Sequence, residues 1–365
     1  MQEIRKVQET MSSKERVMRT FVFEETDRVP IDYSANPGIH HRLCKELGIK
    51  TDDQETLFDV LGVDFREVEA KFVGTNKFPV LPDRKTDPLY GYNMRWIENK
   101  SGGYWDFCDF PLKDADDEVI ANFHVPDLSE FSVKHLRSDL KNISDKAIYV
   151  GNPGLADIIN TLSRVMGMED TLVNLFNEDE ATMVYLKRLN EMRLGTLEMA
   201  LLEAGDLIDF VWLGEDLGTQ IGPMISLEMY RRVLRPMHQQ FIDLAKAYNK
   251  PVMIHTCGSS SWAYEDFIEM GINAVDTLQP EAVNMSPEYL KKNFGGRLSF
   301  HGCISTAGKL AYGTAEETEK VVRDTLEIMM PGGGYHLAPT HLLQDNTPVE
   351  NVIAMYQAAH TYGKY

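Results

Sequence analysis

The sequence predicts an α/β protein built on a TIM (β/α)8 barrel, with an N-terminal helical extension and an irregular insertion. Its C-terminal half alternates strand and helix patterns without a break, which indicates parallel strands joined by helical crossovers. Side chains capable of chemistry follow several of these strands, and in a barrel the carboxyl ends of the strands form one mouth. An open dinucleotide-binding sheet would need a glycine-rich turn after its first strand, and residues 33–38 do not provide one.

The N-terminal part contains a helical extension over residues 1–26, opened by a capping box from Ser12 to Glu15. The first expected strand covers residues 28–33, and the second covers residues 63–66. Apolar residues at helical spacing predict two helices between these strands, over residues 40–48 and 56–61.

The region from residue 71 to residue 139 departs from this regular pattern. Prolines, Gly102-Gly103 and an acidic run separate short aromatic stretches, which is typical of hairpins. We interpret residues 71–139 as an insertion near the barrel mouth, within a single TIM-barrel domain that spans residues 1–365.

Regular alternation returns after the insertion and adds six expected strands to the two that precede it. Helix-capping residues such as Ser286 and Thr314 separate the later strands. Pro236 lies inside the helix that follows Ser226, where it should kink or break that helix. The expected strands of this part are residues 147–151, 209–214, 252–257, 274–278, 298–304 and 335–338.

The charge of the chain narrows the classes of partner. With 37 Lys and Arg against 56 Asp and Glu, the net charge is −19, which disfavours nucleic acid and anionic membrane surfaces as partners. No stretch approaches the ~20 apolar residues of a membrane span, and no apolar signal core follows the first methionine. Four cysteines do not form a disulfide framework in a chain of this length, so we expect a cytoplasmic protein.

Two strands end in the pattern His-x-Cys. His255 and Cys257 point to the same side of an extended strand, and so do His301 and Cys303. Imidazole and thiolate are the usual ligands of zinc, and three protein ligands with one open position indicate a catalytic site. A single cysteine at a strand end is more often inert packing. Two such ends at one barrel mouth favour zinc over packing.

A family resemblance is carried by residues 252–259, 271–280, 300–305, 332–341 and 346–351. The chain resembles the uroporphyrinogen decarboxylase superfamily over roughly its C-terminal half, and more loosely at residues 27–30. The decarboxylases of this superfamily carry an Arg-Gln-Ala-Gly-Arg segment near the first strand, and this chain lacks it. Of the two groups of enzymes in this superfamily, the chain is therefore more similar to the corrinoid-dependent methyltransferases.

This resemblance implies a zinc site and a corrinoid cofactor. The methyltransferases bind zinc through His-x-Cys and a later cysteine, which implies His255, Cys257 and Cys303 as ligands here. Enzymes that methylate coenzyme M take their third cysteine near the last strand, where this chain has residues 335–341 without cysteine. The resemblance therefore implies O-demethylation of a methoxylated, aromatic small molecule, with transfer to the Co(I) corrinoid of a partner protein. A methylcorrinoid:thiol methyltransferase and a tetrapyrrole decarboxylase or binding protein are the alternatives.

The remaining candidate residues follow strands of the expected barrel. Glu215 is a candidate catalytic residue and fourth zinc ligand, with a loop carboxylate that binds backbone amides as the alternative. Asp216 is a second candidate catalytic residue, or one that holds a ligating histidine. His301 is a candidate for a core histidine or one that orients a ligand. Candidates for the substrate pocket, with packing or capping as the alternative, are Asn152, His336, His341 and Gln344. The sequence makes no prediction of oligomeric state.

Overall fold

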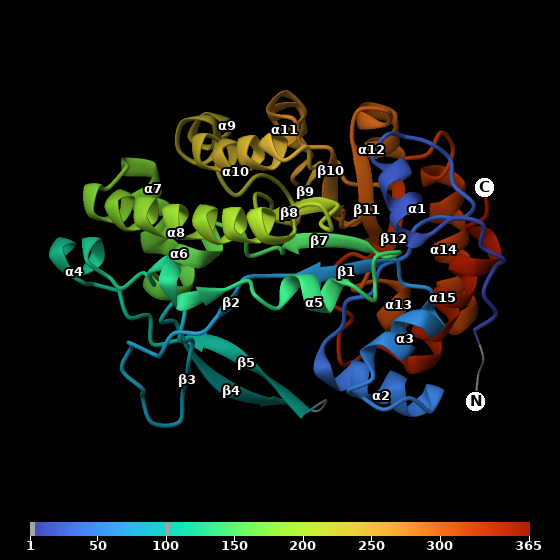
Figure 1. Cartoon of the computed structure of the whole chain (residues 1–365), viewed down its shortest axis with the longest axis horizontal. Coiled ribbons are helices and arrows are strands. Elements are labelled where there is room, and N and C mark those ends of the chain that lie inside the picture. Colours follow the sequence, from blue (N-terminus) through green and yellow to red (C-terminus); the bar gives the residue numbers. More distant parts are fainter. Residues whose placement is uncertain (1–3, 100–101) are drawn as a thin grey trace.

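A parallel sheet forms the centre of the molecule (Figure 1). The structure, a computed structural model, describes residues 4–99 and 102–365. Seven parallel strands follow one another in the order β1-β7-β8-β9-β10-β11-β12. Their bounds are β1 (Phe65–Val68), β7 (Ala147–Gly151), β8 (Phe210–Gly214), β9 (Val252–Thr256), β10 (Ala274–Thr277), β11 (Ser299–Ile304) and β12 (Tyr335–Pro339). The sheet curls with helices outside it, which confirms the α/β class and the TIM-like barrel.

Residues 30–36 take the place of an eighth strand between the two edges of this sheet. Ile31 pairs in parallel with Leu337 of β12, and the backbone N–H of Asp32 donates to the carbonyl of Leu337 at 3.0 Å. On the other side, the backbone N–H of Asp64 donates to the carbonyl of Ile31 at 2.9 Å. The barrel is therefore closed by single bridges rather than by a full strand.

Helices follow the strands and cover the outside of the barrel (Figure 1). Several begin at the capping residues expected from sequence: the Ser286 side chain accepts from Tyr289, and Thr314 forms a capping box with Glu317. The covering helices are α2 (Pro37–Leu47), α3 (Gln54–Leu61), α6 (Ile159–Met166), α7 (Met168–Asn177), α8 (Glu180–Ala204), α10 (Arg235–Ala247), α11 (Tyr264–Met270), α12 (Pro287–Phe294), α14 (Ala315–Met329) and α15 (Val349–Tyr362).

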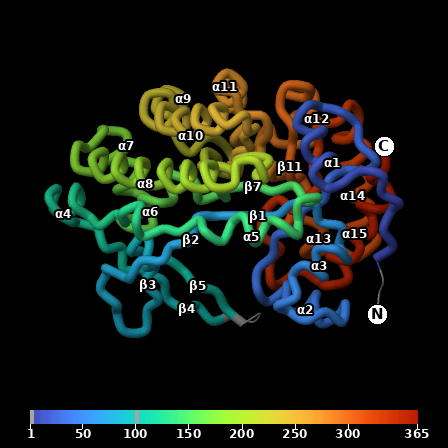
Figure 2. Tube along the Cα trace, viewed as in Figure 1, coloured from blue at the N-terminus to red at the C-terminus, as the bar shows by residue number. Residues whose placement is uncertain are grey.

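The expected N-terminal helix is present as α1 (Ser13–Thr20). Val17 and Phe21 are buried in one cluster with Phe210 of the barrel, and the rings of Phe21 and Phe210 are 5.2 Å apart. This cluster fills the barrel interior on the side opposite the carboxyl ends of the strands. Figure 2 shows the N-terminal segment beside α15, where the backbone N–H of Arg5 donates to the Gln357 side chain at 2.9 Å.

A buried ion-pair network ties α1 to the start of β1. The Arg16 guanidinium lies 2.7 Å from Asp27 and 2.6 Å from Asp64. Arg28 adds a second contact to Asp64 at 2.7 Å. Burial alone would raise the pKa of Asp64, but Arg28 and Arg16 hold that pKa below its usual value. The network therefore depends on an ionised carboxylate at the barrel floor.

The described residues of the region from 71 to 139 form two small antiparallel sheets. One pairs β2 (Lys71–Phe72) with β6 (Phe131–Ser132). The other joins β3 (Lys85–Thr86), β4 (Asn93–Asn99) and β5 (Gly102–Cys108), which project from the barrel at the lower left of Figure 1. Three short helical segments complete the region: α4 (Asp117–Ala121), η1 (Leu128–Glu130) and α5 (Leu136–Leu140).

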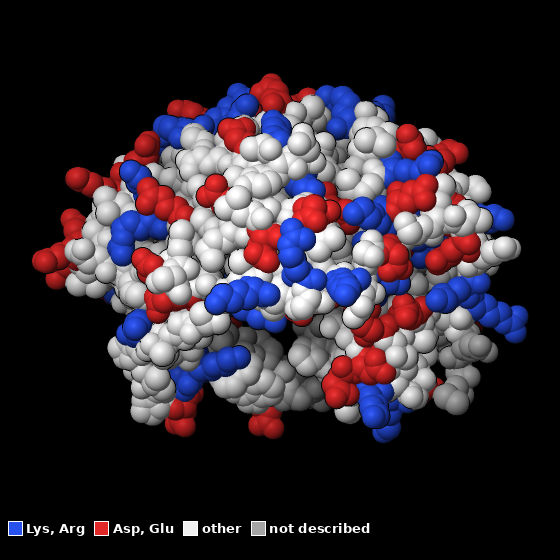
Figure 3. All heavy atoms as spheres, viewed as in Figure 1, with Lys and Arg blue, Asp and Glu red and all other residues white. Residues whose placement is uncertain are grey.

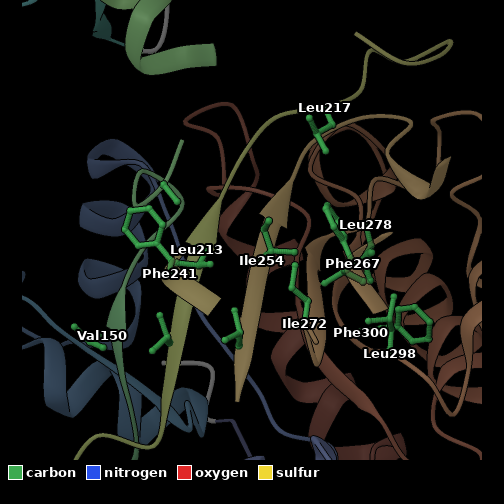
Figure 4. Packing of buried hydrophobic residues seen from close by; sticks show 14 of the residues in the cluster. Val150, Leu213, Leu217, Phe241, Ile254, Phe267, Ile272, Leu278, Leu298 and Phe300 are labelled. Carbon is green, nitrogen blue, oxygen red and sulfur yellow. The ribbon is translucent and has the colours of Figure 1, made fainter. Parts of the chain in front are cut away.

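The main hydrophobic core lies between the sheet and the covering helices (Figure 4). Val150, Leu213 and Ile254 project from successive strands towards Phe241 of α10 and Phe267 of α11. Alternate residues of the same strands face the barrel interior instead. This alternation places His255, which follows Ile254, on the inward side.

Pro236 is accommodated without a break in the chain direction. Residues Tyr230–Leu234 form a π-helical turn after α9 (Leu227–Met229), and α10 begins at Arg235. Pro236 therefore falls in the first turn of a new helix, where its missing N–H costs no helical hydrogen bond.

The helices and the surface give two further facts. Within residues 4–99 and 102–365, no helix combines the length and apolarity that a membrane crossing requires. On the face drawn in Figure 3, acidic and basic side chains are interspersed, with a recess at its lower edge between the hairpin and α2.

Candidate metal site and its cavity

Three side chains converge at the carboxyl ends of the strands. His255 is the penultimate residue of β9, Cys257 follows the end of that strand, and His341 comes from the loop after β12. The ligand atoms of these three residues all lie within 4.8 Å of one another. The Cys257 Sγ is 3.3 Å from the His255 Nε2. Nitrogen and sulfur donors at this separation could close around one metal ion.

Asp276 holds His255 from behind. One oxygen of the Asp276 carboxylate lies 2.6 Å from the His255 Nδ1, and the other lies 2.6 Å from the His301 Nδ1. His301 extends this series of hydrogen-bonded side chains, because its Nε2 lies 3.1 Å from Asp32. Because Nδ1 of His255 is bound to the carboxylate, its Nε2 is directed to Cys257 and available to a metal. This is the carboxylate–histidine arrangement that supports metal ligands in zinc sites.

Burial and ion pairing set the charges of the hydrogen-bonded side chains His255, Asp276, His301 and Asp32. Burial opposes a charged His301, but the carboxylates of Asp276 and Asp32 outweigh it and raise the pKa of His301 to about 9. Burial alone would raise the pKa of Asp276, yet His301 and His255 hold that pKa far below its usual range. Asp276 is therefore an ionised carboxylate shared by two imidazoles.

His341 and Cys257 differ in how ready they are to bind a metal. Burial, together with the neighbouring His255, lowers the pKa of His341, so its imidazole is neutral near pH 7. Burial raises the pKa of the Cys257 thiol, whereas contact with His255 lowers it. A bound metal would displace the thiol proton, because the thiolate is the ligand form.

Asp216 lies beside the converging group. One oxygen of its carboxylate accepts a hydrogen bond from the backbone N–H of Cys257 at 2.9 Å and lies 3.7 Å from the His255 Nε2. The other accepts from the Asn160 side chain at 2.8 Å. Asp216 therefore positions the backbone at Cys257, and its role as a catalytic residue stays a prediction.

Glu215 points away from the three ligands and towards the start of α6. Its two oxygens accept hydrogen bonds from the backbone N–H groups of Ile158 and Ile159, at 2.9 and 3.1 Å. His238 lies 3.1 Å away, and both side chains are completely buried. Burial raises the pKa of Glu215 to about 8 and lowers that of His238 to about 4, so the pair is neutral at pH 7. The geometry corrects the expectation of a fourth ligand and matches the alternative, a carboxylate that binds backbone amides.

Cys303 does not join His255 and Cys257, which corrects the expected ligand set. It is 1% exposed and lies in the main hydrophobic core. The backbone explains the difference: φ is 115° at Gly302 and 70° at Cys303, so the regular alternation of faces fails here. Burial raises the pKa of the Cys303 thiol far above its usual value. The thiol is protonated in this environment.

Two of the four candidate pocket residues lie elsewhere. His336 is fully buried inside the barrel, its ring 5.5 Å from that of Phe21 and 5.6 Å from that of Phe65. Gln344 donates to the carbonyl of Leu342 in the loop after β12. Neither residue lines the cavity at the converging side chains. Packing, the alternative interpretation, describes His336.

A cavity of about 280 Å³ opens beside the three side chains. Asn152 and His341, two of the candidates from sequence, line it together with His255. Aromatic rings and carboxylates make up much of the wall, including Tyr33, Tyr149, Trp212, Asp32 and Glu67. The cavity thus offers flat apolar surfaces next to a set of metal-binding atoms.

Sequence reasoning missed Asp276 and Asp32. Asp276 interrupts the apolar strand β10, and an acidic residue in a fully buried strand needs a partner. That signal was available before the structure. Asp32 belongs to residues 30–36, which close the barrel. Only its contact with His301 in the folded protein shows that it supports the site.

Comparison with known proteins agrees with the barrel. The family model "Uroporphyrinogen decarboxylase (URO-D)" matches residues 158–362, more than half of the chain. The chain belongs to the URO-D family. The matched region includes His255, Cys257, Asp276, and His341. No curated protein sequence matches this URO-D family chain at a significant level.

Solved structures also resemble this URO-D family protein. A structure described as "methyltransferase from Methanosarcina mazei" is 17% identical, with a TM-score of 0.67. The likeness covers 97% of this chain and 99% of that one. A native xylanase 10B from Thermotoga maritima is 10% identical over 67% of this chain and 85% of that one, with a TM-score of 0.41. The first likeness supports a shared fold.

The residues present fit a zinc ion. Two imidazole nitrogens and one thiolate are a donor set that zinc accepts, and three protein ligands leave one position open. The Asp276 carboxylate behind His255 supplies the supporting hydrogen bond that such ligands need. His255, Cys257 and His341 are therefore the residues that could hold the metal.

Proposed function

We propose that this URO-D family protein is a zinc-dependent methyltransferase. In this proposal it takes a methyl group from a methoxylated aromatic compound and transfers it to the Co(I) corrinoid of a partner protein. The convergence of His255, Cys257 and His341 beside an aromatic cavity is the observation that carries the proposal. The similar fold of the Methanosarcina mazei methyltransferase is in keeping with it.

The chemistry requires a way to stabilise charge on oxygen. The carbon–oxygen bond of a methyl ether breaks slowly because the departing oxygen holds negative charge poorly. Zinc held by the three side chains would supply a Lewis acid that neutralises this charge. A site with one thiolate and two neutral imidazoles retains net positive charge, which suits an oxygen leaving group better than two thiolates would.

The chain's own residues would position the donor and the ligands. The rings of Tyr149 and Trp212, whose centroids are 4.9 Å apart, provide a wall against which an aromatic ring can pack. Asp276 fixes the His255 ring so that Nε2 faces the cavity side. The corrinoid would bring the methyl-accepting cobalt, which is chemistry that no protein side chain offers.

Methyl transfer to a Co(I) corrinoid protein tests the proposal. The purified protein, the corrinoid protein and a methoxylated aromatic compound should give the spectrum of a methylcorrinoid, and removal of zinc should abolish the change. Cys257→Ser should behave like the zinc-free protein. Undiminished transfer without zinc, or methylation only of a thiol from methylcorrinoid, would contradict the proposal.

A further inference from the structure

A second cavity lies apart from the proposed ligands, between the barrel and the insertion. Its volume is about 260 Å³. Strand β7, helix α8 and the loop before β4 contribute to its walls. Apolar side chains supply much of the lining, including Leu89, Val150, Leu155, Met192 and Leu197. Asn152 lines both this cavity and the one at the converging ligands, so the two adjoin.

Two arginines line this second cavity, and neither forms an ion pair with a carboxylate of the described residues. Within the described part of the chain, Arg164 forms no ion pair or side-chain hydrogen bond. Its guanidinium is held by aromatic rings, 5.0 Å from Phe107 and 6.0 Å from Tyr92. Stacking of this kind fixes the direction of the cation and leaves its N–H groups free to donate.

Arg193 is the second cation and is only 4% exposed. Its Nη1 donates to the Asp157 carbonyl and its Nη2 to the Thr161 hydroxyl, each at 2.7 Å. The Nε is buried and has no partner among the described residues. Tyr90 covers the guanidinium at 5.1 Å. One donor of a buried cation is thus unsatisfied beside an open cavity.

The surroundings do not neutralise these cations. Burial raises the pKa of the Asp157 carboxyl well above its usual value, which weakens Asp157 as a counter-charge for the two arginines. Glu69 is the only acid among the described residues that line the cavity, and it is exposed. Elsewhere in this chain a buried arginine such as Arg16 contacts two carboxylates. A buried cation without a counter-charge is costly, which points to an anionic ligand.

We propose that the cavity at Arg164 and Arg193 binds the carboxylate of a small organic acid with an apolar body. The guanidinium groups would donate to the carboxylate, and the aliphatic wall around Met192 would cover the body. The inference rests on the proposed function for the identity of the acid: it is the methyl donor, a methoxylated aromatic acid. Its anchored end then lies next to the cavity of the metal-site residues.

Binding measurements on the zinc-loaded protein, without a corrinoid protein, test this inference. In titration calorimetry, 4-methoxybenzoate should bind about tenfold or more tightly than 4-methoxybenzyl alcohol, its neutral counterpart. Arg164→Gln should lose this preference and leave the affinity for the alcohol unchanged. Arg164→Lys should restore part of it. Arg297→Gln, which removes a surface pair with Glu265, is the matched control and should bind like wild type.

The outcomes separate this inference from the proposed function. Equal affinity for acid and alcohol in the wild type would overturn the acid site, and so would an acid affinity that Arg164→Gln leaves unchanged. Cys257→Ser should still prefer the acid although it transfers no methyl group. Arg164 is half-buried and makes no structural hydrogen bond, so a melting temperature close to wild type should accompany its loss of affinity.

Discussion

Asp276 is the residue on which the orientation of His255 depends. It bonds to His255 and His301 at 2.6 Å each, and a neutral amide could not accept from both imidazoles with the same strength. We expect Asp276→Asn to weaken zinc binding by about 10- to 100-fold. Competition with a chromophoric chelator measures the change.

Asp32→Asn is the matched control for this substitution. Asp32 contacts His301 but is not bonded to His255, so its loss should change zinc affinity far less. A wild-type zinc affinity in Asp276→Asn, or an equal loss in both variants, would contradict the orienting role of Asp276.

Glu215 allows a test at the same scale that depends on pH. Its folded pKa of about 8 lies above the usual 4.5, so its contribution to stability is complete below pH 4.5 and is lost as pH rises towards 8. Between pH 6.5 and 8 the free energy of unfolding should therefore fall by about 1 kcal/mol per pH unit more in wild type than in Glu215→Gln. Urea unfolding at several pH values measures the difference.

The same variant tests the position of Glu215. Because its carboxyl bonds to Ile158, Ile159 and His238 rather than to the three converging side chains, Glu215→Gln should retain wild-type zinc content. Loss of zinc with an unchanged pH profile would show that Glu215 is a ligand after all.

Which residues converge could be predicted only in part. Period-2 alternation correctly puts His255 and Cys257 on one side, because β9 is a regular strand. It fails for Cys303, since positive φ angles at the end of β11 turn the thiol into the core. His341 lies in a loop, where no periodicity indicates direction, so its approach to His255 depends on tertiary structure.

At the scale of elements, α1 is held to the barrel by charge as well as by packing. Asp64 lies under β1 with no exposure and pairs with Arg16 and Arg28. We expect Asp64→Ala to lower the free energy of unfolding by about 3–5 kcal/mol, because it removes the buried carboxylate that two buried guanidinium groups share. Chemical denaturation at pH 7 measures this loss.

An exposed pair on the same helix serves as the control. Arg19 and Glu15 are both more than 40% exposed, so Arg19→Ala should change stability by less than about 0.5 kcal/mol. If Arg19→Ala and Asp64→Ala lowered the free energy of unfolding by similar amounts, burial of the ion pairs would add no stability over an exposed pair.

Elements were predictable where local pattern and tertiary structure agree. Capping residues such as Ser286 and Thr314 mark helix starts correctly, because the cap is a local hydrogen bond. The first expected strand keeps one isolated bridge, from Ile31 to Leu337 of β12, because its pairing depends on that distant partner. Pro236 lies in the first turn of α10, directly after the π-helical turn, so it interrupts no hydrogen bond inside α10.

At the scale of the whole molecule, the order of elements predicts the barrel, and the barrel predicts which strand ends meet. Side chains after β8, β9 and β12 gather at one end, as a closed parallel sheet requires. The second cavity could not be foreseen, because its walls come from β7, α8 and the insertion together. No sequence pattern links Arg164 to Arg193 as neighbours.

The most direct test of the proposed metal site is the zinc content of the purified protein, measured by mass spectrometry of the metal without chelators during purification. We expect about one zinc per chain in wild type and in Cys303→Ser, and little zinc in His341→Ala and Cys257→Ser. A wild-type protein without zinc would contradict the proposed site. So would zinc that His341→Ala retains and Cys303→Ser loses.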